Sequence, residues 1–269
     1  MEPVRSVSFD RAADFYDRTR GLDPAVSAAQ TALLADQLAA APGPALEIGV
    51  GTGRVALPLG QAGYQLVGVD LSAPMLERLR AKDPDAQVPV VLGDATALPF
   101  ADDAFGAAIA CHVLHLVADW IAVVAELRRV LRPGGVLLVC RGAAGDGLTA
   151  DVTRRVRDAV GVRPRRVSLD QLDSLDAHVA ATGGTVETLP PIERAPGSDA
   201  GAESRTVAAY LDDLAAGIYS WTWDLPEDRL AAALAQVRRW VTDELGDPTQ
   251  VQLPVPPVRW HRYVLTPVA

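Results

Sequence analysis

The stretch Ala45-Leu46-Glu47-Ile48-Gly49-Val50-Gly51-Thr52-Gly53-Arg54 decides the fold of this chain. Apolar residues lead into an acid, three glycines follow at alternate positions, and an apolar-patterned segment continues from Val55. This pattern is typical of a short buried strand, a glycine turn and a helix. Glycine permits positive φ and close approach to the backbone, while the helix directs free N–H groups at whatever binds there. The stretch therefore predicts a binding loop for a nucleotide-like ligand.

The composition fits a cytoplasmic globular protein with one large domain or one domain carrying a substantial insertion. The chain has 269 residues, of which 49% are hydrophobic and 22% charged. Its net charge of -9 does not favour nucleic acid or an anionic membrane as a partner. No apolar run reaches the roughly 18 residues that span a bilayer, and the charged stretch 1–20 lacks the apolar core of a signal peptide. The oligomeric state is left open.

Apolar runs and helical patterns alternate from residue 45 onward. After the opening strand, the expected strands are 65–70, 88–94, 105–111, 136–140, 185–192 and 258–265. The expected helices are 8–20, 24–41, 72–82, 119–131, 148–160, 168–182, 203–218 and 226–245. This alternation predicts a parallel sheet with helices on both faces, and ligands on such sheets bind at the carboxyl ends of the strands.

The glycine loop could bind either a dinucleotide or another nucleotide-like ligand. A dinucleotide fingerprint needs glycine three residues after Gly51, where this chain has Arg54. Asp70, at the end of the second expected strand, is placed to accept hydrogen bonds from both ribose hydroxyls. Asp94, at the end of the third, could accept from an adenine amino group. The acids together with the glycines are more specific than the glycines alone.

The chain resembles the class I S-adenosylmethionine-dependent methyltransferases, within the large group that acts mostly on small molecules. The motifs that carry the resemblance are Glu47 to Gly53, Val69-Asp70-Leu71-Ser72 with Met75, Gly93 to Phe100, Cys111 to Leu116, and Leu131 to Gly135. The resemblance implies an α/β fold with a doubly wound, Rossmann-like sheet of seven strands, mostly parallel with the last strand antiparallel. It further implies N-terminal helices in 1–44 that close over the cofactor, a core from 45–194 and 258–269, and an inserted helical lid at 195–257.

The resemblance also assigns the contacts of the cofactor, S-adenosyl-L-methionine. The expected cofactor-binding residues are Tyr16, Arg20, Glu47, Gly49, Gly51, Gly53, Asp70, Leu71, Met75, Asp94, Ala95 and His112. Glu47 lies near the amino group of the methionine part, Asp70 binds ribose, and Asp94 with Ala95 reads the adenine edge. A buried acid is costly unless it is satisfied, although helix N-termini could satisfy these acids without a ligand.

His112 and His115 are the candidate catalytic residues, because histidine can take a proton from an oxygen nucleophile near neutral pH. The methyltransferase family that the chain resembles commonly has a histidine at the position of His112 without needing it for chemistry. A structural role is therefore the alternative. Cys111 and Cys140 lie in apolar runs and are interpreted as reduced core residues. No metal site is expected, since histidines and cysteines show no ligand spacing in the sequence.

Two features of the second half have more than one interpretation. An aromatic cluster, Tyr210, Tyr219, Trp221 and Trp223, either lines an apolar substrate pocket or packs the inserted helices. The arginine run from 154 to 166 is interpreted as a solvated helix face rather than as a site for an anionic partner.

The sequence thus predicts an enzyme that moves a methyl group from S-adenosylmethionine to an oxygen, nitrogen or carbon nucleophile of a small molecule. The sulfonium donor is already activated, so the protein mainly aligns the reactants for in-line displacement and excludes water. A cofactor-binding protein without turnover and a nicotinamide-dependent oxidoreductase are the alternatives. Neither nucleic acid nor a membrane is expected as a partner.

Overall fold

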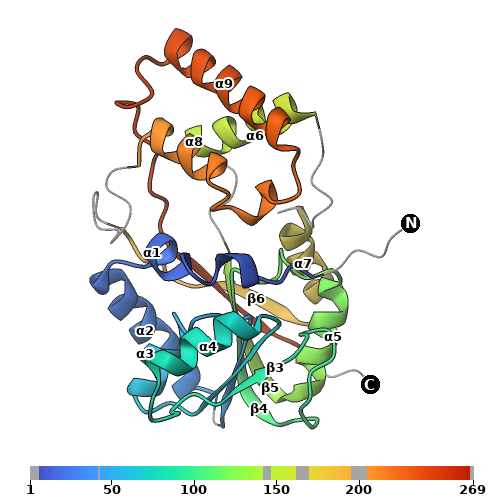
Figure 1. Cartoon of the computed structure of the whole chain (residues 1–269). Coiled ribbons are helices and arrows are strands. Elements are labelled where there is room, and N and C mark those ends of the chain that lie inside the picture. The colour runs from blue at the N-terminus through green and yellow to red at the C-terminus, as the bar shows by residue number, and fades with distance from the viewer. Residues whose placement is uncertain (1–5, 42, 142–146, 162–169, 195–204, 267–269) are drawn as a thin grey trace. The chain divides into compact units, whose positions relative to one another are not determined.

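The chain contains a seven-stranded sheet in the order β3-β2-β1-β4-β5-β7-β6, with helices packed against it (Figure 1). The computed structural model describes residues 6–41, 43–141, 147–161, 170–194 and 205–266. The strands are β1 (Ala45–Ile48), β2 (Leu66–Asp70), β3 (Val90–Leu92), β4 (Phe105–Cys111), β5 (Leu131–Arg141), β6 (Thr185–Thr188) and β7 (Arg259–Val264). β7 pairs antiparallel with both β5 and β6, and every other neighbouring pair is parallel. This confirms the predicted fold class.

The helices begin and end close to their predicted positions. They are α1 (Tyr16–Arg20), α2 (Pro24–Ala39), α3 (Ala56–Gln61), α4 (Ala73–Lys82), α5 (Trp120–Val130), α6 (Leu148–Val160), α7 (Asp170–Ala181), α8 (Val207–Ala215) and α9 (Glu227–Glu244), with 3-10 turns at Asp10–Ala12 and Ser220–Thr222. Side-chain caps fix four of the helix starts, because Asp23, Ser72, Asp119 and Thr206 each accept a hydrogen bond from a first-turn N–H.

Among the predicted elements whose bounds differ from the structure, two differ for a clear physical reason. The expected helix 8–20 divides into the 3-10 turn Asp10–Ala12 and α1, and Asp10 is held by the hydroxyl of Ser72, so tertiary contact overrides the local helical pattern. The expected strand 185–192 ends at Thr188. Pro190 and Pro191 follow it, and proline has no N–H to donate to a ladder.

Helices cover both faces of the sheet. Buried residues of α5 and α7 pack on one face, against alternate strand residues such as Ala108 and Ala110 of β4. Those of α2, α3 and α4 pack on the other face, where Ile109 and Cys111 of the same strand point. β4 is buried along its whole length, as expected of a central strand in a doubly covered sheet.

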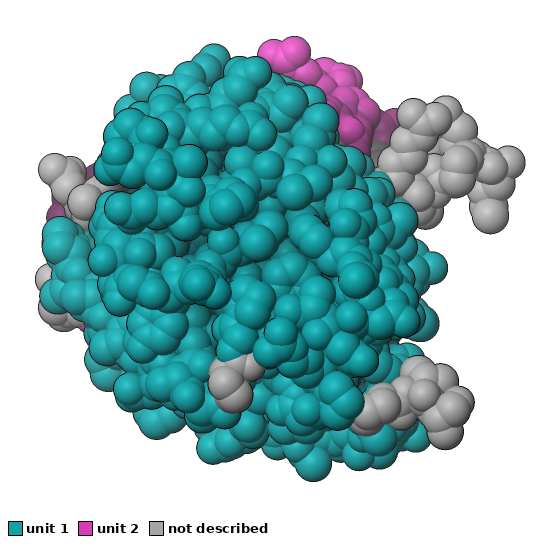
Figure 2. All heavy atoms as spheres, turned by 90° about the horizontal axis from the view of Figure 1, so that it is seen from below, with its two compact units in different colours: residues 1–142, 167–193, 258–269 teal, residues 143–166, 194–257 magenta. Residues whose placement is uncertain are grey.

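The chain divides into two compact units, which Figure 2 distinguishes by colour. The sheet unit comprises 1–142, 167–193 and 258–269, and the helical unit comprises 143–166 and 194–257. The helical unit includes α6, which the sequence analysis assigned to the core range 45–194. The reason is that Val152, Val156 and Val160 of α6 share a buried cluster with α8 and α9. The linker 195–202 and the end of the arginine run, 163–166, lie outside the described residues.

Three of the four clustered aromatic residues pack inside the helical unit. Tyr210 is buried, its hydroxyl lies 2.7 Å from that of Thr153, and its ring meets Tyr219 edge-on. Trp221 packs against the same apolar cluster. These contacts support the packing interpretation for Tyr210, Tyr219 and Trp221. Among the helices that the structure describes, none has the length and apolarity to cross a membrane.

Candidate functional site

Four neighbouring parallel strands, β3-β2-β1-β4, bring the predicted site residues to one edge of the sheet. Glu47 lies at the end of β1, Asp70 ends β2, Asp94 follows β3 and His112 follows β4. The chain crosses from β3 past β1 to β4, so the strand order reverses at β1. Ligands of open α/β sheets bind at the carboxyl ends of the strands at such a reversal.

Glu47 is a buried acid with an unsatisfied oxygen. Its side chain is 2% exposed, and Oε2 has no hydrogen-bond partner in the structure. Burial raises the pKa of Glu47 well above its usual value, with the charge of Cys111 adding to the effect, while Arg54 and the backbone N–H of Ala56 oppose it. An orphan acceptor in such a place fits a ligand that brings its own positively charged donor. The amino group of S-adenosylmethionine is such a donor.

The glycine loop that follows β1 needs glycine for both conformation and space. Gly49, Gly51 and Gly53 all have positive φ. A Cβ at Gly49 would lie 2.4 Å from Cγ2 of Val113, and one at Gly53 would lie 2.6 Å from Cγ of Leu57. Val113 and Leu57 therefore leave no room for a side chain at Gly49 and Gly53, and positive φ disfavours one at all three positions.

The Gly49→Ala variant should be less stable than the Gly63→Ala variant, although both positions have positive φ. Left-handed conformation costs alanine about 1–2 kcal/mol at either position. Only Gly49 adds a clash, since no atom lies within 4 Å of a Cβ at Gly63. Overpacking should cost Gly49→Ala roughly a further 1–3 kcal/mol in the free energy of unfolding. Urea unfolding of both variants measures the difference, and equal losses would contradict this description of the loop.

Asp70 already orders the loop and retains capacity for a ligand. Its Oδ2 accepts from the N–H of Gly51 and its Oδ1 from that of Ser72, both at 2.8 Å. Burial raises the pKa of Asp70, and these N–H groups oppose the rise. The N–H of Leu71 also interacts with this carboxylate, so about one of its roughly four lone-pair sites remains for a ribose hydroxyl. Next to it, Leu71 is 40% exposed, as an apolar residue that flanks an adenine ring would be.

The remaining adenine-side residues lie near the loop. Met75 of α4 is buried, and its Cε would be 3.2 Å from a Cβ at Gly51. Asp94 Oδ1 accepts from both the N–H and the hydroxyl of Thr96, at 2.9 Å each, which fixes the turn after β3. Ala95 is buried in that turn. The roles of Leu71, Met75, Asp94 and Ala95 toward adenine stay predictions.

The N-terminal segment 6–20 is fastened to this edge of the sheet unit. Asp10 accepts from the hydroxyl of Ser72 at 2.6 Å, and Asp17 accepts from that of Thr52 at 2.5 Å. The carbonyl of Arg20 accepts from the guanidinium of Arg54 at 2.9 Å. In Figure 1, α1 lies just above α2 and α4. The sequence analysis selected Tyr16 and Arg20 from this segment but missed Asp10 and Asp17, whose partners are distant in sequence.

Tyr16 belongs to the same group of side chains. Burial raises its pKa, while the charge of Arg54 opposes the rise and that of Cys111 reinforces it. Phe9 meets Tyr16 edge-on at 5.9 Å between ring centroids. The contact of Tyr16 and Arg20 with the cofactor stays a prediction.

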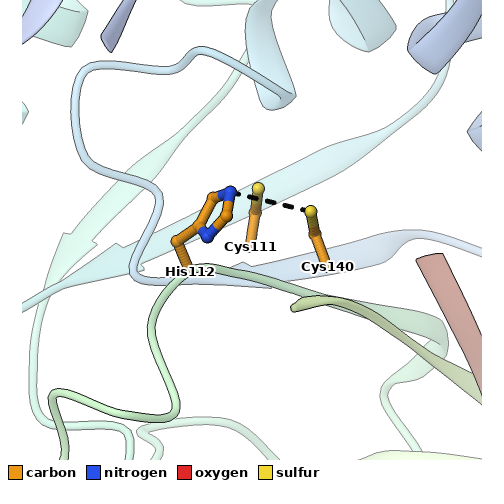
Figure 3. A group of neighbouring side chains, drawn as sticks. All are labelled: Cys111, His112 and Cys140. Carbon is orange, nitrogen blue, oxygen red and sulfur yellow. Dashed lines mark hydrogen bonds between the residues drawn. The ribbon is translucent and has the colours of Figure 1, made fainter. Parts of the chain in front are cut away.

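A second group of functional side chains lies at the ends of β4 and β5 (Figure 3). Cys111 and Cys140 are buried and occupy paired register positions, and His112 Nε2 lies 3.7 Å from Cys140 Sγ. Arg54 reaches Cys111 Sγ with Nη2 at 3.5 Å. The hydrogen bond with Cys140 lowers the pKa of the Cys111 thiol, with help from Arg54, although burial acts against it. The sequence analysis used Arg54 only to exclude a dinucleotide and missed this arrangement.

His112 and His115 differ in their surroundings. His112 has a φ of +53°, a left-handed conformation that is uncommon outside glycine but enriched for histidine. Burial, with the charge of Arg20, lowers the pKa of His115 to about 4. His115 is therefore neutral at pH 7 but a weak base, which counts against a role as general base. Both assignments as catalytic residues stay predictions.

His115 should make the fold sensitive to acid. Its pKa in the folded chain is about 4, below the usual 6.5, so the unfolded chain binds the proton more readily as pH falls below 6.5. The free energy of unfolding should therefore decrease between about pH 6.5 and 4, and His115→Gln should remove part of that slope. Urea unfolding at several pH values between about 4 and 6.5 measures this slope. An identical slope in His115→Gln and wild type would show that the pKa of His115 is not lowered in the folded chain.

Comparisons with known proteins agree with this geometry. Residues 46–139 match a family model described as a methyltransferase domain. A demethylmenaquinone methyltransferase of Renibacterium salmoninarum is 38% identical over 136 residues, 49% of this chain and 55% of that protein. A Mycobacterium sp. (strain KMS) protein of the same name is 42% identical over 95 residues, 35% of this chain and 40% of that protein. The chain thus spans about half the length of the curated relatives it matches.

A solved structure shares the fold over nearly the whole chain. An S-adenosylmethionine-dependent methyltransferase of Thermotoga maritima has a TM-score of 0.57 and 20% identity, covering 95% of this chain and 97% of that one. At this identity the structural likeness shows the fold alone. Residues 46–139 thus match a methyltransferase domain, the curated relatives matched there are methyltransferases, and the sheet has the fold of a class I S-adenosylmethionine-dependent methyltransferase.

Proposed function

We propose that this protein is an enzyme that transfers a methyl group from S-adenosylmethionine to a nucleophilic atom of a small molecule. The observation that carries the proposal is the buried, unpartnered Oε2 of Glu47 beside a loop of three glycines that all have positive φ. Asp70 supports it, since this acid ends the neighbouring strand and keeps acceptor capacity beyond the backbone N–H groups of Gly51, Ser72 and Leu71. The two acids are suited to the amino group and the ribose of one ligand.

The residues around this site would bind and orient the cofactor rather than activate it chemically. When bound, S-adenosylmethionine would supply a methyl group on a positively charged sulfur: the nucleophile would bond to the methyl carbon as the carbon–sulfur bond breaks, and S-adenosylhomocysteine would leave. Glu47 would hold the amino group, Asp70 the ribose, and the bare loop would let the cofactor approach the backbone. Fixing the donor in this way removes the entropy cost of the encounter, which is a main source of rate in such displacements.

The acceptor side of the proposed site is the end of β4. His112 lies there in a left-handed conformation, directly after the last strand residue. We infer that His112 contacts the methionine part or the acceptor. His115 is a poor candidate for general base because its pKa is about 4. An acceptor that is already nucleophilic, or one deprotonated by another group, is consistent with these surroundings.

The names of the curated relatives indicate a chemical class for the methyl acceptor. The proteins matched are demethylmenaquinone methyltransferases, whose name describes action on a small organic molecule. We propose a small organic acceptor for this chain on that basis. The role of the helical unit as a lid, and of Trp223 in an acceptor pocket, stays a prediction. Trp223 Nε1 donates to the carbonyl of Gly217 at 2.7 Å, so its ring is held in place within that unit.

Transfer of isotope tests the proposal. The protein is incubated with S-adenosylmethionine labelled in the methyl group and with a low-molecular-weight extract from which proteins and nucleic acids have been removed. Labelled product in the extract fraction is expected, together with stoichiometric S-adenosylhomocysteine. Tight cofactor binding without any labelled product would instead favour a binding protein without turnover. Binding of a nicotinamide cofactor without binding of S-adenosylhomocysteine would favour the oxidoreductase.

The matched control for this assay is Glu77→Gln, an exposed acid of α4. It should transfer label as wild type does, whereas Glu47→Gln should require a much higher cofactor concentration for the same rate.

A further inference from the structure

We propose that Cys111, His112 and Cys140 form a binding site for Zn²⁺ with three protein ligands and one open coordination position. Their ligand atoms, two Sγ and one imidazole nitrogen, all lie within 4.8 Å of one another (Figure 3). The proposal departs from the expectation from sequence, which treats both cysteines as core residues and expects no metal.

The strand register creates the site. Cys111 of β4 and Cys140 of β5 are direct partners in a parallel ladder, so both side chains project from the same face of the sheet. The strand ends at Cys111, and the left-handed φ of His112 turns the backbone so that the imidazole Nε2 lies 3.7 Å from Cys140 Sγ. The backbone N–H of His112 donates to the carbonyl of Cys140 at 3.2 Å, which ties the two ligands together.

The separations suit tetrahedral coordination. With Zn–S near 2.3 Å and Zn–N near 2.0–2.1 Å, neighbouring ligand atoms of a tetrahedral site lie roughly 3.6–3.8 Å apart. The contact of His112 with Cys140 has this length, at 3.7 Å. The other ligand atoms are within 4.8 Å, so small side-chain rotations, with no change in the strands, would complete the geometry.

The chemistry of the ligands selects the metal class. Thiolate and imidazole suit Zn²⁺, whereas Mg²⁺ and Ca²⁺ prefer oxygen ligands. The two thiols would lose their protons to solvent on binding, and the resulting charges would balance those of the ion. The guanidinium of Arg54, 3.5 Å from Cys111 Sγ, would then donate to a metal-bound thiolate, as outer-shell donors do. Glu47 of the neighbouring strand β1 faces the same side of the sheet.

The open position gives the site a further use that rests on the proposed function. Three protein ligands with a fourth position free are typical of catalytic rather than structural zinc. Because the end of β4 is the acceptor side of the proposed reaction, a hydroxyl or thiol acceptor could occupy that position. A metal-bound acceptor loses its proton more readily, which would supply the activation that His115 cannot.

Cobalt substitution tests the site on the reduced full-length protein. Titration with Co²⁺ should give thiolate-to-metal absorption in the near ultraviolet and strong tetrahedral bands in the visible, saturating at one ion per chain and bleached by Zn²⁺. X-ray absorption of the zinc form should show two sulfur neighbours near 2.3 Å and nitrogen or oxygen near 2.0–2.1 Å. Only nitrogen and oxygen neighbours, or no thiolate band with both thiols reduced, would overturn the proposal.

Variants show which residues bind the ion. Cys140→Ser and His112→Asn, in which asparagine tolerates positive φ, should weaken binding by more than the roughly 10–100-fold typical of outer-shell changes. His261→Asn, at a histidine of β7 outside the cluster, is the control and should bind as wild type does. A wild-type spectrum in Cys140→Ser or His112→Asn would overturn the assignment. If a variant fails to fold, the cobalt and X-ray absorption spectra of the wild-type protein still test whether two thiolates bind the ion.

Failure here is distinguishable from failure of the proposed function. Calorimetry with S-adenosylhomocysteine is run on the wild-type protein after treatment with a chelator. Cofactor binding without cobalt bands would overturn the zinc site alone, and cobalt bands without cofactor binding would overturn the methyltransferase proposal alone.

Discussion

Glu47→Gln is expected to weaken binding of S-adenosylhomocysteine by about 10–150-fold and, at pH 8, to make the ligand-free protein more stable. The loss follows from removing a charged hydrogen bond to the amino group, worth roughly 1.5–3 kcal/mol, where 1.4 kcal/mol is tenfold in affinity. The gain follows because burial holds the pKa of Glu47 well above its usual value. The substituted glutamine would occupy the same space without a buried charge.

The sign of the stability effect depends on pH. Because the pKa of Glu47 is raised in the folded chain, the unfolded chain releases its proton first as pH rises past about 4.5. The free energy of unfolding therefore falls with increasing pH in wild type until the folded pKa is passed. Glu47→Gln lacks this fall, so the two melting temperatures should diverge between pH 5 and 8.

Glu77→Gln is the control for Glu47→Gln, because it removes an acid that is exposed and not buried. Glu77 is exposed on α4, so its replacement should change neither affinity nor the pH slope. Calorimetry measures affinity, and melting curves at several pH values measure stability. If Glu47→Gln bound the cofactor as wild type does, the amino group would not be at Glu47.

Asp70→Asn should lose both cofactor affinity and stability, the opposite stability effect to that of Glu47→Gln. Asp70 accepts from Gly51 and Ser72 with different oxygens. Asparagine has only one carbonyl oxygen, so one N–H would face an amide NH₂ instead of an acceptor. Leaving a buried donor unsatisfied costs about 1–3 kcal/mol. The melting temperature should fall, and the affinity for S-adenosylhomocysteine should fall at least tenfold, since the ribose also loses a charged acceptor.

The matched control for this change is Asp85→Asn, at an exposed acid beyond α4. It should leave both quantities unchanged. Asp70→Asn with a normal melting temperature would show that the loop after β1 does not depend on Asp70. Asp70→Asn with lowered stability but normal affinity would show that the acid orders the loop without binding ribose.

The sheet and the edge that carries the site could be predicted because their signals are local. Glycines at alternate positions, an acid after each apolar run and helix caps such as Ser72 each specify structure within a few residues. A parallel sheet then requires that Glu47, Asp70 and Asp94, each at a strand end, lie at one edge. The structure has this arrangement.

What the sequence did not reveal depends on contacts distant along the chain. The amphipathic pattern of α6 shows that one face is buried but not against which core, and the helix belongs to the helical unit. Thr52 with Asp17, and Arg54 with Arg20 and Cys111, join segments separated by more than thirty residues. The group of Cys111, His112 and Cys140 exists only because of the register between β4 and β5. No spacing in the sequence encodes it.

Titration calorimetry with S-adenosylhomocysteine tests the central claim most directly, because it measures cofactor binding without knowledge of the acceptor. Wild-type protein should bind one molecule per chain, Glu47→Gln should bind at least about tenfold more weakly, and NADH should give no binding heat. A folded wild-type protein that does not bind S-adenosylhomocysteine, or one that binds it no more tightly than Glu47→Gln does, would contradict the proposed site.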